Sequence, residues 1–236
     1  RWRDYGTIIN AAAYTAVDTA ETPDGRRDAW AANVTAVTAL ARIATENGIT
    51  LVHVSSDYVF DGTSTTPYTE TDPLSPLGVY GQTKAAADAI VATVPRHYII
   101  RTSWVIGDGQ NFVRTMASLA QRGINPTVVS DQTGRLTFTT DLAAGIHHLL
   151  DTRAPHGTYN LTGTGEPASW DDIARAVYQL TGHDPARITD VTTEQYFANS
   201  AGPIAPRPAN SILDLTKIEA AGFRPQDWRI TLEKYL

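Results

Sequence analysis

The chain has 236 residues, of which 42% are hydrophobic and 19% are charged, with a formal net charge of -6 and no cysteine. This length allows a substantial core in one large domain or two small ones, and zero cysteines exclude disulfides and thiolate metal sites. The charged residues are interspersed and form no basic stripe that could bind nucleic acid. No apolar run reaches the length of about 18 residues that a membrane span needs, and the histidines show no spacing typical of a metal site. We therefore expect a cytoplasmic protein with a small-molecule partner and no metal.

The first half of the sequence alternates short apolar runs with longer helical patterns. This alternation is typical of a parallel sheet covered by helices on both faces. It predicts strands at 7–14, 49–56 and 97–107 and helices at 24–47 and 79–94. The loop between the second strand and the second helix is rich in Gly, Pro, Ser, Thr and Asp and is unusually long, which makes it a candidate functional loop.

The second half continues with a looser pattern. Its predicted elements are helices at 111–123, 140–150 and 169–182, and strands at 126–130 and 157–163. Ser169 is the expected cap of the last helix, with Asp171 and Asp172 in its first turn. The proline-rich segment 202–211 is expected to lie on the surface or to line a pocket.

Tyr80 and Lys84 lie four residues apart at the start of the helix predicted at 79–94. Positions with this spacing share one helical face, and two side chains that merely share a face are the plainer alternative. An ammonium roughly 6 Å from a phenol would lower the phenol pKa by about two units at an effective dielectric near 20. A tyrosine shifted in this way could serve as a general acid or base.

Ser55 and Ser56 stand where a buried strand ends, at the sheet edge where ligands bind in open α/β folds. A lone serine at such a position more often caps a loop. The place of Ser56 ahead of Tyr80 favours instead a second hydroxyl beside the tyrosine.

Six stretches together are similar to the dTDP-4-dehydrorhamnose reductase family, within the extended short-chain dehydrogenase/reductases. They are "INAAAYTAVDTAE", "HVSSDYVFDG", "YTETDPLSPLGVYGQTK", "RTSWVIG", "DQTG" and "RPANSILD", and they follow the family's order and spacing. The resemblance covers essentially the whole chain. It implies an α/β fold with a doubly wound, Rossmann-like parallel sheet and a smaller C-terminal α/β substrate domain.

The resemblance also implies domain limits. Residues 1–104 would be a dinucleotide-binding domain without its N-terminal βαβ part. Residues 105–236 would mainly bind substrate, with about 137–160 returning to the first domain.

Carried over to this chain, the family's catalytic triad falls on Ser56, Tyr80 and Lys84. The implied reaction delivers hydride from NADPH, or from NADH, to the C4 ketone of a dTDP-linked deoxy-hexulose. Tyr80 would protonate the alkoxide, Ser56 would bind that oxygen, and Lys84 would lower the pKa of Tyr80 while holding the nicotinamide ribose.

Other matching positions imply binding roles. For the cofactor they are Ala11, Ala12, Tyr14 and Ser55. For the sugar and the nucleotide end of the substrate they are Asp57, Tyr58, Trp104, Asp131, Gln132 and Arg207, with Arg207 placed to meet the diphosphate.

The chain departs from the family pattern in two places. Leu136 stands where the family usually has proline. No glycine-rich phosphate-binding turn occurs, and the chain begins at what would be the fourth strand, so roughly 60 residues of the dinucleotide-binding unit are expected to be missing. Truncation, processing and natural divergence could each explain this, and we favour loss of the N-terminal part. We expect weak or absent cofactor binding by this polypeptide.

Three alternatives stay open at this point. The Asp57-Tyr58 pair has no glutamate, which argues against a 4,6-dehydratase, whereas a 4-epimerase lacks comparable motif support. A non-catalytic regulatory or binding subunit of the same fold is the third, although it has less reason to retain a full Ser-Tyr-Lys set. A homodimer and an N-terminal fusion to an epimerase domain are further expectations.

Overall fold

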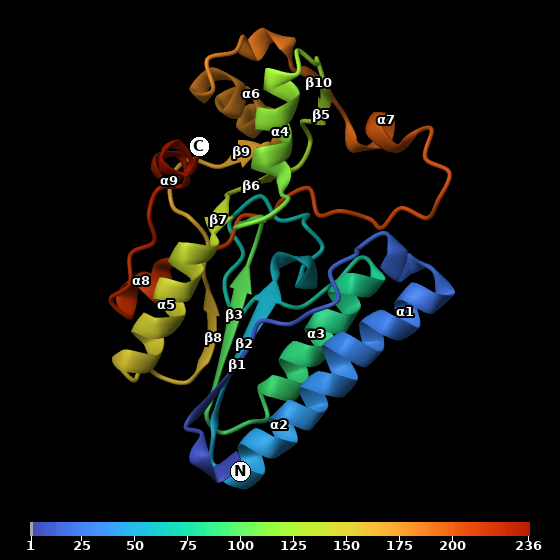
Figure 1. Ribbon diagram of the computed structural model, residues 1–236. Coiled ribbons are helices and arrows are strands. Elements are labelled where there is room, and N and C mark those ends of the chain that lie inside the picture. Colours follow the sequence, from blue (N-terminus) through green and yellow to red (C-terminus); the bar gives the residue numbers. More distant parts are fainter. Residues whose placement is uncertain (1) are drawn as a thin grey trace.

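The largest element of the computed structural model, which describes residues 2–236, is a four-stranded parallel sheet (Figure 1). Its order is β1-β2-β3-β8. The strands are β1 (Thr7–Asn10), β2 (Thr50–Ser56), β3 (His97–Thr102) and β8 (Gly157–Asn160). The register pairs Ile9 with Val52 and Val54 with Ile100. The predicted parallel α/β sheet is therefore confirmed.

Helices cover both faces of this sheet (Figure 1). One face carries α1 (Pro23–Trp30), α2 (Ala36–Asn47) and α3 (Val79–Val91), and the other carries α5 (Thr139–Asp151) and α8 (Thr216–Ala220). Successive strand residues point to opposite faces, so Leu51 packs with the α2 and α3 residues while Val52 packs with α5. Burial on both faces explains why the strands are continuously apolar in sequence.

A helical run from Pro23 to Asn47 matches the expectation for 24–47 but is not a uniform α-helix. A π-helical turn at Ala31–Thr35 separates α1 from α2, and Gly48 ends the run at φ 65°. The extra residue of a π turn redirects side chains, and such turns are frequent at functional sites. Here the turn carries the buried Asn33.

A second core lies beyond the carboxyl ends of the sheet, at the top of Figure 1. Its helices are α4 (Phe112–Gln121), α6 (Trp170–Leu180) and α9 (Trp228–Tyr235), and the short helix α7 (Thr193–Phe197), which has no buried residue, lies against β5 outside it. Its strand pairs are β4 (Val105–Ile106) with β7 (Thr137–Phe138), β5 (Thr127–Val129) with β10 (Thr189–Val191), and β6 (Thr133–Gly134) with β9 (Ala168–Ser169). Leu136, the departure from the family proline, is fully buried in this core.

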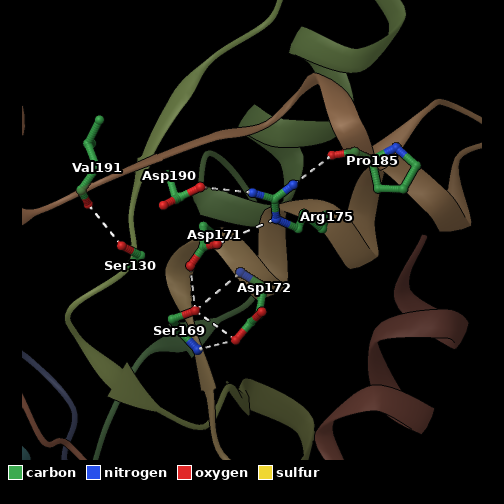
Figure 2. A network of polar contacts seen from close by, with 8 residues as sticks. All are labelled: Ser130, Ser169, Asp171, Asp172, Arg175, Pro185, Asp190 and Val191. Atoms are coloured by element: carbon green, nitrogen blue, oxygen red, sulfur yellow. Dashed lines mark hydrogen bonds and ion pairs between the residues drawn. The ribbon is translucent and has the colours of Figure 1, made fainter.

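The start of α6 is fixed by a capping box (Figure 2). The Ser169 hydroxyl accepts a hydrogen bond from the Asp172 backbone N–H, and the Asp172 carboxylate accepts one from the Ser169 N–H at 3.1 Å. Arg175 then ties the helix to Pro185 O at 3.2 Å and to Asp190 at 3.4 Å. The predicted cap is confirmed, and it sets Trp170 as the first residue of α6.

Four predicted element boundaries are wrong by three residues or more. The strands expected at 7–14 and 157–163 end at Asn10 and Asn160. The strand expected at 97–107 is interrupted, because Trp104 has a φ of 48° that extended backbone does not allow. The helix expected to reach Val94 ends at Val91. The short elements β6, β7, β9 and β10 were not predicted, since two or three residues show no periodicity.

Candidate active site

A cavity of about 470 Å³ opens where β1, β2 and β3 end, beside the first turn of α3. We call it the sheet-end cavity. Of the predicted site residues its lining contains Ala11, Ser55, Ser56, Asp57, Tyr58, Tyr80, Lys84 and Trp104. The fold thus brings together the three predicted catalytic side chains.

Ser56 and Tyr80 meet because α3 approaches the end of β2 very closely. A Cβ on Gly81 would lie 2.2 Å from the backbone oxygen of Tyr58, so only glycine permits this approach. The Ser56 hydroxyl accepts a hydrogen bond from Tyr58 N at 3.2 Å, which caps the short turn Asp57–Val59, and it donates to the Asp57 carboxylate at 3.0 Å. It also lies beside the Tyr80 phenol. Capping and contact with the tyrosine, posed as alternatives by the sequence, are both present.

The expected lowering of the Tyr80 pKa is wrong for this structure. Burial raises the pKa of Tyr80 to about 12, and the neighbouring Ser56 hydroxyl offsets this only in part. The charges that act on the phenol are those of Asp57 and Asp88, which raise its pKa further. Tyr80 therefore holds its proton firmly at neutral pH.

Lys84 is 1% exposed and its Nζ faces the strand rather than the phenol. Nζ donates to Val54 O at 2.6 Å and lies 3.3 Å from Nε2 of His53. Burial lowers the pKa of Lys84 to about 8, against the opposing effect of Asp88 one turn along α3. These contacts explain why Lys84 does not lower the pKa of Tyr80.

The two residues after Ser56 complete the polar wall of the cavity. Burial raises the pKa of Asp57 to about 6, and hydrogen bonds from Ser211 and Ser56 offset this only partly. The ring of Tyr58 meets that of Tyr80 edge to face, with centroids 5.5 Å apart. The wall therefore offers a carboxyl group that titrates near neutral pH and two phenols.

The turn after β1 is only partly in the cavity. Ala11 lines it, whereas Ala12 and Tyr14 do not. The Ala12 N–H donates to the Asn10 side chain, and the backbone of Tyr14 is bracketed by the Asn33 amide, which also donates to Thr83 on α3 at 2.9 Å. Asn33, which the sequence analysis missed, thereby fixes this turn against the helix of Lys84.

A second cavity, of about 290 Å³, lies in the smaller core, and we call it the aromatic cavity. Its lining includes Gln132, Arg207, Phe112, Met116, Trp170 and Phe197. Trp104 of the sheet-end cavity stacks on Trp170 with ring centroids 3.8 Å apart, so one aromatic pair stands between the two cavities. A Cβ on Gly134 would lie 2.9 Å from the Trp104 ring, so the stack needs glycine there.

Two predicted nucleotide residues make contacts within the protein. The Asp131 carboxylate lines neither cavity and accepts hydrogen bonds from the N–H and hydroxyl of Thr193, at 3.0 and 2.6 Å. Arg207 lines the aromatic cavity and donates to both carboxylate oxygens of Asp18, at 2.6 and 2.8 Å. Arg207 therefore links this cavity to the loop after β1.

Several lining residues escaped the sequence analysis. Thr102, the last residue of β3, and Ser103, which follows it, line the sheet-end cavity, so the strand-end rule that selected Ser56 could have found them. The Thr102 hydroxyl is buried and has no hydrogen-bond partner within residues 2–236. Trp170, Phe112 and Phe197 carry no local motif that separates them from core residues.

The described part of the chain shows no grouping of three or more His, Asp or Glu side chains that could hold a metal ion. None of the helices found in residues 2–236 has the length and apolar character needed to cross a membrane.

Comparison with known proteins supports one family. Residues 3–236 match the model of the RmlD substrate binding domain. The spore coat polysaccharide biosynthesis protein SpsK of Bacillus subtilis is 41% identical over 231 residues, which cover 97% of this chain and 78% of SpsK. The dTDP-4-dehydrorhamnose reductase of Aggregatibacter actinomycetemcomitans is 40% identical, over 96% of this chain and 79% of the relative.

A solved structure agrees with these relatives. The crystal structure of a Bacillus anthracis dTDP-4-dehydrorhamnose reductase in complex with NADP is similar at a TM-score of 0.89 and 33% identity, covering 98% of this chain and 79% of that one. The chain belongs to the family of the RmlD substrate binding domain, and its relatives confirm the resemblance to the dTDP-4-dehydrorhamnose reductases that the sequence motifs indicated.

Proposed function

We propose that the protein reduces the C4 ketone of dTDP-4-dehydro-L-rhamnose to dTDP-L-rhamnose with NADPH, as an oxidoreductase of nucleotide-sugar biosynthesis. The observation that carries this proposal is the meeting of Ser56, Tyr80 and Lys84 in one cavity at the end of a parallel sheet. NADPH supplies the hydride. NADH is the alternative donor.

The residues of the sheet-end cavity fit the reacting end of such a cofactor. The small side chain of Ala11 and the neighbouring Ala13 leave room beside the strand ends, and the unpartnered Thr102 hydroxyl offers a polar contact there. Lys84 and Tyr80 would hold the nicotinamide ribose, while Ser55 lies at the same edge. The cavity volume of about 470 Å³ suits a small-molecule group.

Tyr80 acts as the acid and Ser56 positions the oxygen. A phenol with a pKa of about 12 is fully protonated at neutral pH, so its proton is available when the ketone oxygen gains negative charge. An alkoxide is a stronger base than a phenolate, which makes the transfer favourable. Ser56, whose hydroxyl lies beside Tyr80 and donates to Asp57 in this structure, would turn to donate to the same oxygen, in the manner of an oxyanion contact.

The aromatic cavity supports a nucleotide-linked substrate. Trp170 and Phe197 offer faces on which a base can stack, and Gln132 offers an amide that can read its edge. Arg207 carries the charge suited to a diphosphate and would bind it while still held by Asp18 or in exchange for it. Trp104, Asp57 and Tyr58 would line the sugar between the two cavities.

Replacing Tyr80 tests this function. Tyr80→Phe removes only the proton donor, so turnover of dTDP-4-dehydro-L-rhamnose, followed by NADPH oxidation, should fall by about 10²–10⁴-fold with little change in KM. Tyr5→Phe, at an exposed tyrosine outside the cavity, should leave turnover unchanged. Ser56→Thr should keep activity and Ser56→Ala should lose most of it. Undiminished turnover by Tyr80→Phe would mean that another group is the acid, whereas absence of turnover in the unmodified protein would favour the non-catalytic subunit.

A further inference from the structure

We propose that Asn10 and His53 are positioning residues that stabilise the neutral amine form of Lys84 through a directed chain of hydrogen bonds. The contacts belong to the protein itself. Their consequence for catalysis rests on the function proposed above.

His53 lies at the centre of this chain and is completely buried. It stands on β2 between Asn10, the last residue of β1, and Lys84 on α3. Its Nδ1 is 3.0 Å from Nδ2 of Asn10, and its Nε2 is 3.3 Å from Nζ of Lys84. Each ring nitrogen therefore has one partner, on opposite sides of the ring.

The orientation of the Asn10 amide fixes which ring nitrogen carries hydrogen. Its Oδ1 accepts a hydrogen bond from the Ala12 N–H at 3.3 Å, so its NH₂ group faces His53. Nδ1 must then accept, and a neutral imidazole places its hydrogen on Nε2. Burial and the nearby Lys84 charge lower the pKa of His53 to about 3, which excludes the imidazolium at neutral pH.

The Nε2–H group points at Nζ of Lys84, and an ammonium has no lone pair to receive it. A neutral amine does have one, and it still carries two hydrogens, one of which is donated to Val54 O. The three contacts are therefore mutually satisfied only when Lys84 is an amine. This directed contact adds to the burial that lowers the lysine pKa.

The other charged or titratable groups near Lys84 are carboxylates, an arginine and a phenol. The carboxylate of Asp88 on α3 favours the ammonium form of Lys84, but it also forms an ion pair with Arg101 on β3, whose Nε lies 3.0 Å from Asp88 Oδ2. Asp57 and Tyr80 line the same cavity as Lys84. His53 is thus the group that opposes the carboxylates at the lysine nitrogen.

The arrangement would help to return a proton to Tyr80 after each reduction. The phenolate left by proton transfer to the substrate must recover a proton, and Lys84 can pass one on from its ammonium form and regain it from solvent. One solvent proton is consumed per ketone reduced. A lysine that titrates near pH 8 gives up this proton more readily than one at the ordinary pKa of 10.5.

The test is a titration of the cofactor-free protein, which requires no turnover. The chain has only three lysines, Lys84, Lys217 and Lys234, so ¹³C labelling of lysine resolves each side chain. We expect Lys84 to titrate with a midpoint near 8 and, above that midpoint, ¹⁵N-labelled His53 to show hydrogen on Nε2. Titration of Lys84 together with the other two lysines, or hydrogen on Nδ1 of His53 above the midpoint, would overturn the proposal.

The variant Asn10→Asp reverses the direction of the hydrogen-bond chain and should therefore raise the pKa of Lys84. A carboxylate at this position accepts hydrogen from Nδ1, which frees Nε2 to accept from the ammonium, so the Lys84 midpoint should rise by about one to two units. His53→Gln, whose carbonyl can accept from the ammonium, should shift it in the same direction. His97→Gln, at a histidine on β3 whose Nδ1 contacts Val94 O, should not shift it.

An unchanged or lower midpoint in Asn10→Asp would contradict the proposed chain, and if that variant does not fold, the titration of the unmodified protein decides. Because loss of packing would hydrate Lys84 and also raise its midpoint, the rise supports the chain only if ¹⁵N-labelled His53 in Asn10→Asp carries its hydrogen on Nδ1. Failure of the reductase assay with the expected titration would reject only the proposed function.

Discussion

The sheet-end cavity and the aromatic cavity are built in different ways. The first combines small and apolar side chains with polar groups from the ends of β2 and β3 and the start of α3, including Lys84. The buried side chains of Asp88 and Arg101 form an ion pair close to Lys84. The second is lined mainly by aromatic and apolar side chains from α4, α6, α7 and β5. Substitutions in the first should therefore change protonation, stability and kcat, whereas those in the second should change KM.

The largest expected effect concerns the buried pair of Asp88 and Arg101, whose side chains are 2% and 6% exposed. Asp88→Asn leaves the guanidinium buried without a counter-charge and should cost about 3–5 kcal/mol of unfolding free energy in urea titrations at neutral pH. Arg101→Met should cost less, because a lone Asp88 can take up a proton whereas arginine cannot lose one. Asp108→Asn, at the exposed pair with Arg114, is the matched control and should cost less than about 1 kcal/mol. A greater loss in Arg101→Met than in Asp88→Asn would contradict this account.

The next effect is a dependence of stability on pH at Asp57. Its pKa in the folded protein is raised to about 6 from 3.8, so its contribution to stability is fully present below pH 3.8 and is lost as the pH rises through about 6. Asp57→Asn removes this loss. The variant should gain up to about 3 kcal/mol relative to the unmodified protein between pH 4 and pH 8.

Urea titrations of both proteins across this range measure that gain. Because the comparison follows the change with pH, it is insensitive to any constant offset that the amide introduces. A difference that stays constant, or that moves in favour of the unmodified protein as the pH rises, would show that Asp57 is not disfavoured in its ionised form.

The two cavities also differ in how far the sequence could predict them. Ser56, Tyr80 and Lys84 lie in short segments whose strand and helix patterns place them at one sheet edge, so their meeting followed from topology. The pKa of Tyr80 did not follow, because helical spacing says nothing about burial or about His53, which draws Lys84 Nζ away from the phenol.

The aromatic cavity was less accessible to sequence reasoning. Gln132 and Arg207 came only from the family resemblance, and Trp170 and Phe197 read as ordinary core residues. These positions come together through long-range packing such as the stack of Trp104 on Trp170. The backbone of Trp104 has a positive φ, which no local sequence pattern predicts. Regular elements make a site predictable, whereas irregular connections do not.

The smallest effect tests the aromatic cavity alone. Trp170→Ala removes a stacking face worth about 1–3 kcal/mol, so KM for the dTDP-linked substrate should rise about 5- to 150-fold while kcat stays nearly constant. Trp170→Phe retains a smaller face and is the matched control, with a rise of less than about 10-fold. Steady-state kinetics at saturating NADPH separate the two constants.

Because Trp104 stacks on Trp170, the kinetics of Trp170→Ala also show whether the two cavities work independently. Trp104 also lines the sheet-end cavity, so removing its partner could let it move relative to Tyr80. A fall in kcat as large as the rise in KM would mean that the aromatic pair couples the two cavities, because loss of Trp170 would then also disturb the positions of the catalytic side chains. A change in KM alone would mean that the two cavities bind and react as separable parts, since Gly134 and the backbone of Trp104 hold the ring in place without Trp170.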